Sequence, residues 1–257
     1  MIEQVTQQIQ IPALTVACGF EHVFGSKVLT ATKAYGLSDP RASFWLQTKE
    51  GVPTAALYGN NGVLVVSADA ASDPDEIAQL VRDEQFKEVD TNWDQCAALQ
   101  RLLGGITESS YYMEYPGQAP AEEYPDIQEG DLRAVFGVLQ RSHEYYRTHF
   151  RFETWSDDLK QKLDRGLMEL YQLERRGEVV GTGSIISEDA ECGVLAAVAV
   201  VPEYRHQGLG SRISRFLVQR IREKGKTPRL ISGYDEVAEL YKKVGFHACG
   251  RWGELYL

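Results

Sequence analysis

The sequence predicts a mixed α/β (α+β) protein in which strands and helices alternate around a mixed central sheet. An apolar run over residues 194–201 predicts a strand, and Pro202 and two glycines predict the turn that follows it. The apolar residues of 211–224 then recur on one helical face. Residues 229–232 predict a further strand, residues from 235 a helix, and residues 252–257 a final strand.

The segment before this unit predicts helices followed by a hairpin. Apolar residues at 132, 135, 136 and 139 have helical spacing, and Ser156 is expected to cap a second helix that carries Leu159 and Leu163. Residues 168–174 and 178–186 read as two strands joined by a turn at 175–177. Helices, a hairpin and three further strands therefore follow one another in the second half of the chain.

A proline-rich segment predicts where the chain divides. Residues 115–125 contain three prolines and show no helical or strand period. We expect a first domain over residues 1–115, a linker over 116–124 and a second domain over 125–257. Short segments recur in the same order in both halves, which predicts a tandem repeat. They are 45–51 with 171–177, 62–66 with 193–197, and 94–104 with 235–245.

The loop between the strand at 194–201 and the following helix has the chemistry of a phosphate site. The first N–H groups of a helix lack internal partners, and the helix dipole places partial positive charge there. Glycines allow the backbone to approach an anion without an intervening Cβ. No Gly-Lys-Ser/Thr follows, and the glycine spacing differs from the dinucleotide fingerprint. The loop therefore predicts a pyrophosphate cradle of another type.

Two motifs identify a family resemblance. The pattern Arg205-x-x-Gly208-x-Gly210, after a strand that ends in Val-x-Pro, resembles motif A of the GNAT acetyltransferases, which binds acetyl-CoA. Residues 235–246 resemble motif B of the same family, with Asp235 where the family usually has Asn. The resemblance implies a GNAT fold in residues 125–257, with acetyl-CoA as co-substrate. It also implies that the first half is a degenerate copy, because it lacks this loop and has several carboxylates in its place.

The resemblance also implies the residues that hold acetyl-CoA. The strand edge at Ala199 and Val200 would pair with the pantetheine arm, and Asp235 would cap the motif B helix near it. The helix face with Arg212 and Arg215 is a candidate for the 3′-phosphate. The pyrophosphate would contact the loop, with side-chain donors at Arg205 and Gln207 and backbone N–H groups over His206, Gln207, Gly208, Leu209, Gly210 and Ser211.

The implied chemistry is transfer of an acetyl group to a primary amine by an N-acetyltransferase. The resemblance places Tyr241 near the sulfur of coenzyme A, where its phenol would act as the general acid, and Tyr234 is the next candidate. The strand at 194–199 offers no ionisable group as the general base. Glu191, at the start of this strand, is the candidate, and a water chain or an amine that arrives neutral would also suffice. The other candidates are Glu188, Asp189, His143 and Glu144.

Charge, cysteine spacing and hydropathy limit the kinds of partner that the chain is expected to bind. Residues 1–123 contain 7 basic and 17 acidic side chains, which argues against a nucleic-acid partner for that half. The four cysteines have no metal-ligand spacing, so we expect no metal, and no apolar run has the length of a membrane span. No basic-then-apolar segment opens the chain, which favours the cytoplasm. The expected partner is a small-molecule or peptide amine, bound by a monomer or homodimer. The alternative function is a CoA-binding sensor or scaffold without catalysis.

Overall fold

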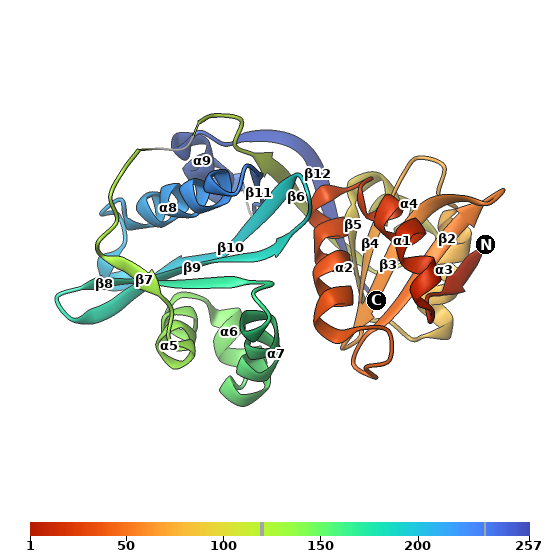
Figure 1. Cartoon of the computed structure of the whole chain (residues 1–257), viewed down its shortest axis with the longest axis horizontal. Coiled ribbons are helices and arrows are strands. Elements are labelled where there is room, and N and C mark those ends of the chain that lie inside the picture. Colours follow the sequence, from red (N-terminus) through yellow and green to blue (C-terminus); the bar gives the residue numbers. More distant parts are fainter. Residues whose placement is uncertain (119–120, 234) are drawn as a thin grey trace. The chain divides into compact units, whose positions relative to one another are not determined.

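The computed structural model describes residues 1–118, 121–233 and 235–257, and their contacts separate two compact units (Figure 1). The first unit contains Met1–Met113, Ile231–Asp235 and Ala248–Leu257, and the second contains Glu114–Leu230 and Glu236–His247. The last strand of the chain therefore belongs to the first unit. Residues 116–118 and 121–124 form no helix or strand, and the division of the chain at residues 116–124 stays a prediction.

The first unit is a mixed sheet with helices on both faces. Its strand order is β1-β2-β3-β4-β5-β12-β6, in which β4 and β5 are parallel and β12 is antiparallel to β5. The strands are β1 (Ile2–Gln4), β2 (Ser43–Lys49), β3 (Val52–Asn60), β4 (Val63–Ala68), β5 (Glu88–Asn92), β6 (Ile106–Glu114) and β12 (His247–Tyr256). The helices are α1 (Ile11–Cys18) and α2 (His22–Tyr35), then α3 (Pro74–Asp83) and α4 (Trp93–Leu103).

Helices α3 and α4 cover the main apolar core of this unit. Leu64 and Val66 of β4 are fully buried there against Ile77 of α3 and Leu99 of α4. Helices α1 and α2 pack against β3 and β4 as well, and Ser67 Oγ of β4 donates to the carbonyl of Ala17 at 2.9 Å. The burial of apolar area on both faces is the main stabilising term of such a layered fold.

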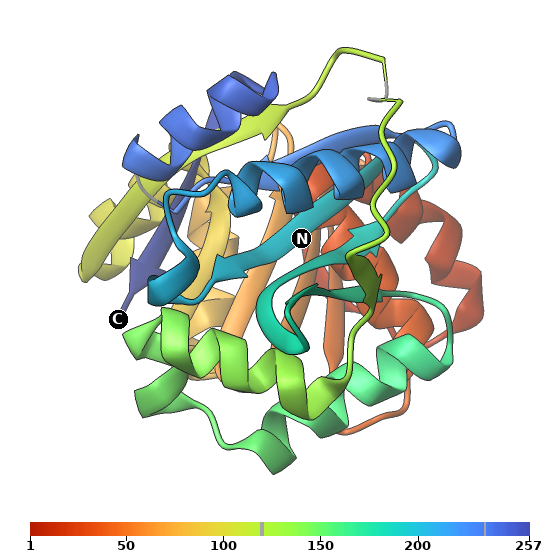
Figure 2. The ribbon, with the colours of Figure 1, turned by 90° about the vertical axis from the view of Figure 1, so that its left-hand side faces the viewer.

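The second unit repeats this arrangement of layers. Its strand order is β11-β10-β9-β8-β7, with α8 on one face and α5 on the other (Figure 2). The strands are β7 (Ile127–Glu129), β8 (Glu169–Arg175), β9 (Glu178–Glu188), β10 (Cys192–Val200) and β11 (Thr227–Ile231). The helices are α5 (Leu132–Ser142), α6 (Glu144–His149), α7 (Phe152–Asp164), α8 (Leu209–Glu223) and α9 (Asp235–Val244).

The two units share their connectivity. In each, a hairpin leads to a third antiparallel strand, and a helix then leads to a parallel neighbour: β2-β3-β4-α3-β5 and β8-β9-β10-α8-β11. The first hairpin turns have the same backbone, with φ of 53° and 80° at Glu50 and Gly51 and 52° and 79° at Arg176 and Gly177. The predicted mixed α/β fold is thereby confirmed, as are the hairpin and the helix after the glycine loop.

One predicted boundary is wrong. Ser156 does not cap α7, which begins at Phe152, and its hydroxyl donates to the Glu153 carbonyl at 3.1 Å inside the helix. Phe152 and Trp155 extend the helix towards its N-terminus because both rings pack against Phe136 of α5. Tertiary packing therefore overrides the preference of serine for a helix N-cap. Within the described ranges, no helix combines the length and apolar character that a bilayer crossing requires.

Candidate functional site

Strand β10 opens away from its parallel neighbour. It pairs with β11 only over Cys192–Val194, whereas its pairing with β9 continues to Val200. The register with β9 shifts between Ala196 and Ala199, and Ala197 adopts a positive φ of 52°. Such a bulge bends a strand and increases its twist. The end of β10 is thus left with an edge that β11 does not occupy.

The helix that follows β10 begins without a side-chain cap. Its N-cap is Gly208 in the left-handed region, with φ of 78°, and its first turn contains no acidic residue. A Cβ added to Gly208 would meet no atom within 4 Å, so the space in front of this helix end is open. Uncapped N–H groups at the positive end of the helix dipole suit an anion, and the geometry therefore fits a pyrophosphate.

The strand edge and the helix end border one cavity of about 570 Å³. The end of α5 and one face of α9 complete its wall, through Ser142 and His143 and through Val237, Leu240 and Tyr241. Gln207 does not line it, and the side chain of Asp235 is outside the described part of the chain. The other predicted cofactor-binding residues do line it, namely Ala199, Val200, Arg205, His206, Gly208, Leu209, Gly210, Ser211 and Tyr241.

Arg205 binds main-chain carbonyls. Its Nε donates to the carbonyl of Val200 at 3.1 Å, and its Nη2 donates to the carbonyl of Ser142 at 2.9 Å. The guanidinium therefore joins the end of β10 to the end of α5. The sequence gives no sign of this contact, because Ser142 is distant in the chain and the family motif concerns only the loop. Donation by Arg205 to a phosphate stays a prediction.

Tyr241 lies in the wall of the cavity on α9. Its ring is 7% exposed and packs edge-on against Phe246, with 5.7 Å between ring centroids. Burial raises the pKa of the Tyr241 phenol, so the hydroxyl keeps its proton at neutral pH. The hydroxyl forms no hydrogen bond with any residue that the structure describes. A proton donor therefore borders the cavity, which leaves the predicted role of general acid open to test.

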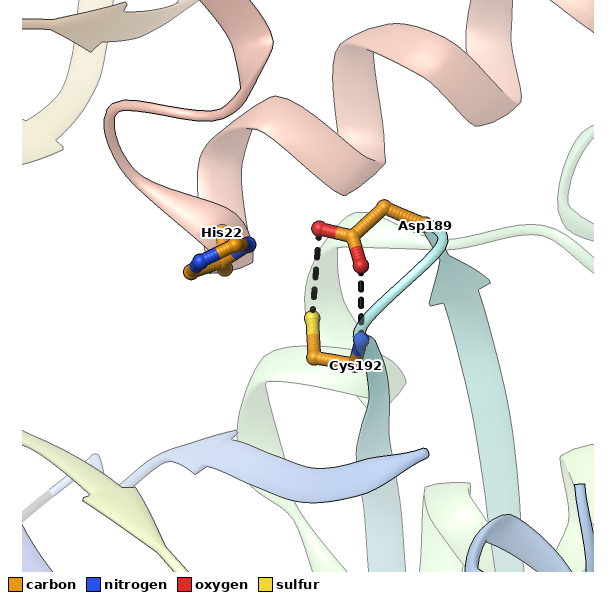
Figure 3. A group of neighbouring side chains, drawn as sticks. All are labelled: His22, Asp189 and Cys192. Carbon is orange, nitrogen blue, oxygen red and sulfur yellow. Dashed lines mark hydrogen bonds between the residues drawn. The ribbon is translucent and has the colours of Figure 1, made fainter. Parts of the chain in front are cut away.

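Glu191 lies at the far end of β10 from the cavity. Asp189 fixes the turn there by accepting from the backbone N–H groups of Glu191 and Cys192, at 2.7 and 2.6 Å. Figure 3 shows the bond from the Cys192 N–H and a second bond that the Cys192 thiol donates to Asp189. The rise of a strand, about 3.3 Å per residue, puts Cys192, the residue after Glu191, about 20 Å from Val198, where the cavity lining begins. This distance disagrees with the predicted role of Glu191 as the base.

Among the alternative bases, His143 borders the cavity. Glu188 binds Lys224 and Lys226, at 2.5 and 2.9 Å, and Asp189 holds the turn before β10. Glu144 follows His143 in the chain but does not line the cavity. The sequence predicts His143 only as one of several alternative bases, because it does not show which residue at the end of α5 lies close to β10.

The chain is similar to known acetyltransferases. Residues 132–246 match the model of the Acetyltransferase (GNAT) family. An amino-acid acetyltransferase from Pseudomonas putida is 28% identical over 92 residues, which cover 35% of this chain and 21% of that protein. The chain thus matches about a fifth of that relative.

Two solved structures share the fold along almost the whole chain. An acetyltransferase from the GNAT family of Colwellia psychrerythraea has a TM-score of 0.63 and 15% identity, covering 100% of this chain and 99% of that one. A tandem GNAT protein from the clavulanic acid biosynthesis pathway has a TM-score of 0.60 and 11% identity, covering 99% and 97%. At these identities the likeness establishes the fold alone.

Proposed function

We propose that the protein transfers an acetyl group from acetyl-CoA to a primary amine, because residues 132–246 match the model of the Acetyltransferase (GNAT) family. The observation that carries this proposal is the single cavity where the open edge of β10, the uncapped start of α8 and Tyr241 meet. Each of these three features supplies one requirement of the reaction: a hold on the pantetheine arm, a hold on the pyrophosphate, and a proton for the leaving thiolate.

Binding would depend mainly on backbone groups. The N–H groups of Leu209, Gly210 and Ser211 are the first of α8, where no side chain competes for them. The edge of β10 at Ala199 and Val200 offers peptide groups that would pair with the amides of pantetheine as an added strand does. Val237 and Leu240, each 37% exposed, offer apolar contacts on the α9 side of the cavity.

Tyr241 would supply the proton that the reaction needs at sulfur. The amine nitrogen forms a bond to the carbonyl carbon, the carbon–sulfur bond breaks, and the thiolate takes a proton from the phenol. The buried phenol stays protonated until this negative charge develops beside it. A positioned acid of this kind contributes roughly 10²- to 10⁴-fold in rate.

In this proposed function, the chain is a tandem GNAT protein whose second half carries the site. The shared connectivity of the two units supports this reading, and so does the tandem GNAT neighbour. The acceptor would be a small-molecule or peptide amine. The relative from Pseudomonas putida acts on an amino acid by its name, so free amino acids are the first acceptors to test.

One observation favours a second candidate, a CoA-binding protein without catalysis. From Val194 to Val200, strand β10 carries no ionisable side chain, so this strand offers no base. Both functions require acetyl-CoA to bind, so only turnover of acetyl-CoA distinguishes them.

A thiol-release assay tests the proposal. Purified full-length protein with acetyl-CoA is offered free amino acids, aliphatic diamines and short peptides, and coenzyme A formation is measured. Thiol release that depends on one of these amines is the expected result. Hydrogen exchange with and without acetyl-CoA should show protection over residues 198–212. Protection without turnover on any amine would favour the non-catalytic alternative, and no protection would contradict both.

A further inference from the structure

The cavity contains few side chains that could accept a proton from an amine. Its titratable members are His143, Tyr204, Arg205, His206 and Tyr241. Arginine stays protonated, and Tyr241 is buried with a raised pKa. The Tyr204 hydroxyl donates at 3.4 Å to Glu178, which does not line the cavity. His206 belongs to the loop in front of α8, at the expected phosphate site. His143 is the titratable member left to accept a proton from the amine.

We propose that His143 is the general base that deprotonates the acceptor amine, and that Arg205 is its positioning residue. The inference rests on the proposed N-acetyltransferase function. It assigns the role of general base, for which β10 offers no side chain. It also gives Arg205 a positioning role in place of phosphate binding.

The backbone at the end of α5 aims His143 at the site. His143 follows the last residue of this helix with extended angles, φ −134° and ψ 126°, and its N–H donates to the Leu139 carbonyl at 2.9 Å. Arg205 binds the carbonyl of Ser142, the residue before His143, and the carbonyl of Val200 on the open edge of β10. One rigid guanidinium thus fixes the histidine-bearing turn to the strand along which pantetheine would lie.

The charges around His143 favour its neutral form. His143 is an exposed residue, but partial desolvation at the cavity and the nearby Arg205 cation lower the pKa of its ring, which is therefore neutral at neutral pH and able to accept a proton. The other groups that face it are the Tyr146 ring of α6, at 6.2 Å between centroids, and Tyr204 and His206 across the cavity. Within the described residues, no hydrogen bond occupies a ring nitrogen of His143.

Two protons leave the acceptor nitrogen during the reaction. An ammonium group gives one proton to a ring nitrogen of His143, which leaves the amine lone pair to attack the thioester carbonyl. The new nitrogen–carbon bond forms, the carbon–sulfur bond breaks with its electron pair on sulfur, and Tyr241 protonates that thiolate. The nitrogen then loses its second proton, which restores the phenol, and His143 releases its proton to water. One proton is released for each amide formed.

The test uses His143→Ala in the full chain with acetyl-CoA and the most active amine of the panel. We expect kcat/KM to fall roughly 10²-fold, the usual contribution of a general base, with the affinity for acetyl-CoA unchanged. Imidazole added to the buffer should restore part of the rate, because it enters the space that the side chain leaves. His247→Gln is the control, since that histidine is exposed at the start of β12 and does not line the cavity.

The pH profile separates a base from a packing residue. Wild-type kcat/KM should rise with pH along a limb that reports His143, and Arg205→Gln should move that limb to higher pH because a neighbouring cation is removed. Proton NMR titration of the His143 ring should show the same upward shift of its pKa. Full activity of His143→Ala would overturn the inference. A loss of activity that imidazole does not rescue, together with a pH profile that Arg205→Gln does not shift, would overturn it as well. Wild-type inactivity on every amine would instead overturn the proposed function, and this inference with it.

Discussion

The two units differ most where they are topologically equivalent, at the start of the helix after the third strand. In the first unit, α3 is capped by Asp73, whose carboxylate accepts from the Asp75 N–H at 2.9 Å, and Asp75 and Glu76 fill the first turn. In the second unit, α8 begins at Gly208 without a side-chain cap or an acid. The first helix end is neutralised by its own carboxylates, whereas the second remains open to an anion.

The edges of the equivalent strands β4 and β10 differ in the same way, since the first is covered and the second is open. In the first unit, two β5 side chains reach the edge of β4: Thr91 Oγ1 donates to the Val66 carbonyl at 3.1 Å, and Asn92 Nδ2 donates to the Ala68 carbonyl at 3.5 Å. In the second unit, the equivalent end of β10 borders the cavity instead. One topology therefore carries a site or closes it, depending on a few polar side chains at one strand edge and one helix end.

The largest expected effect comes from giving α8 the chemistry of α3. Gly208→Glu places a carboxylate at the open helix end, where it would face the pyrophosphate. Two like charges about 4 Å apart near a protein surface repel by about 4 kcal/mol, which corresponds to about 10³-fold in affinity. Calorimetric titration with acetyl-CoA should therefore detect little or no binding.

Gly208→Ala is the matched control for this variant. It imposes the same left-handed strain, on the order of 1 kcal/mol, without the charge. It should bind acetyl-CoA within a few fold of wild type. Equal loss of binding in both variants would mean that the backbone, and not the charge, distinguishes the two helix ends.

The next largest effect concerns a position at which the equivalent helices α4 and α9 carry different residues. Gln100 of α4 stands where α9 has Tyr241. Tyr241→Phe keeps the ring and its packing on Phe246 but removes the proton, so kcat should fall roughly 10²-fold while melting temperature and acetyl-CoA affinity hold.

Tyr115→Phe serves as the control for Tyr241→Phe, because Tyr115 also packs against Phe246 and does not line the cavity. A loss of stability with an unchanged rate per folded molecule would make Tyr241 a core residue only. Unchanged rate and stability would direct attention to Tyr234, which lies outside the described residues.

The sequence predicts most of the second unit because its signals are local. Helical periodicity locates α8, and a glycine turn between two apolar runs locates the hairpin of β8 and β9. The glycine loop likewise predicts the open helix end, since an anion site of this kind depends on residues adjacent in the chain. Such local signals do not depend on tertiary contacts.

The remaining features depend on contacts between distant segments. Nothing in β12 indicates that it pairs with β5 of the first unit, because an apolar pattern does not name its partner strand. The bulge at Ala197 lies in a run of small residues without a turn signal. The position of Glu191 at the start of a strand makes it the predicted base, but only the length of β10 shows how far it lies from the cavity.

A smaller effect should appear in how the stability of each unit depends on pH. Burial, the Asp90 carboxylate and a hydrogen bond shared with Glu88 raise the pKa of Glu254 from 4.5 to about 8 in the first unit. The folded state then binds more protons than the unfolded state between these values, so stability falls as pH rises from about 4.5 to about 8. The loss should be on the order of 1–3 kcal/mol after solvent screening, and Glu254→Gln should remove it.

The second unit should respond in the opposite direction. Hydrogen bonds from Arg212, aided by Arg175, lower the pKa of Asp126 below 3.8, so this contribution is lost as pH falls through that region. Hydrogen exchange followed between pH 5 and 9 should therefore show faster opening of β5 and β12 at high pH, without the same trend in β7 and α8. The same trend in both units would contradict this assignment of the carboxylates.

The smallest expected effect tests whether the arginines of α8 belong to the proposed site. Arg215 forms an ion pair with Glu122, with 3.1 Å between Nε and Oε1, and both side chains are about one-third exposed or more. Such pairs contribute about 0–1 kcal/mol, so Arg215→Gln should scarcely change the melting temperature. Because the partner of Arg215 is a residue of the segment before β7, its removal should also leave the affinities for coenzyme A and dephospho-coenzyme A in the same ratio. A selective loss of coenzyme A affinity would place Arg215 at the 3′-phosphate, and the contrast between α3 and α8 would then extend beyond the first turn of the helix.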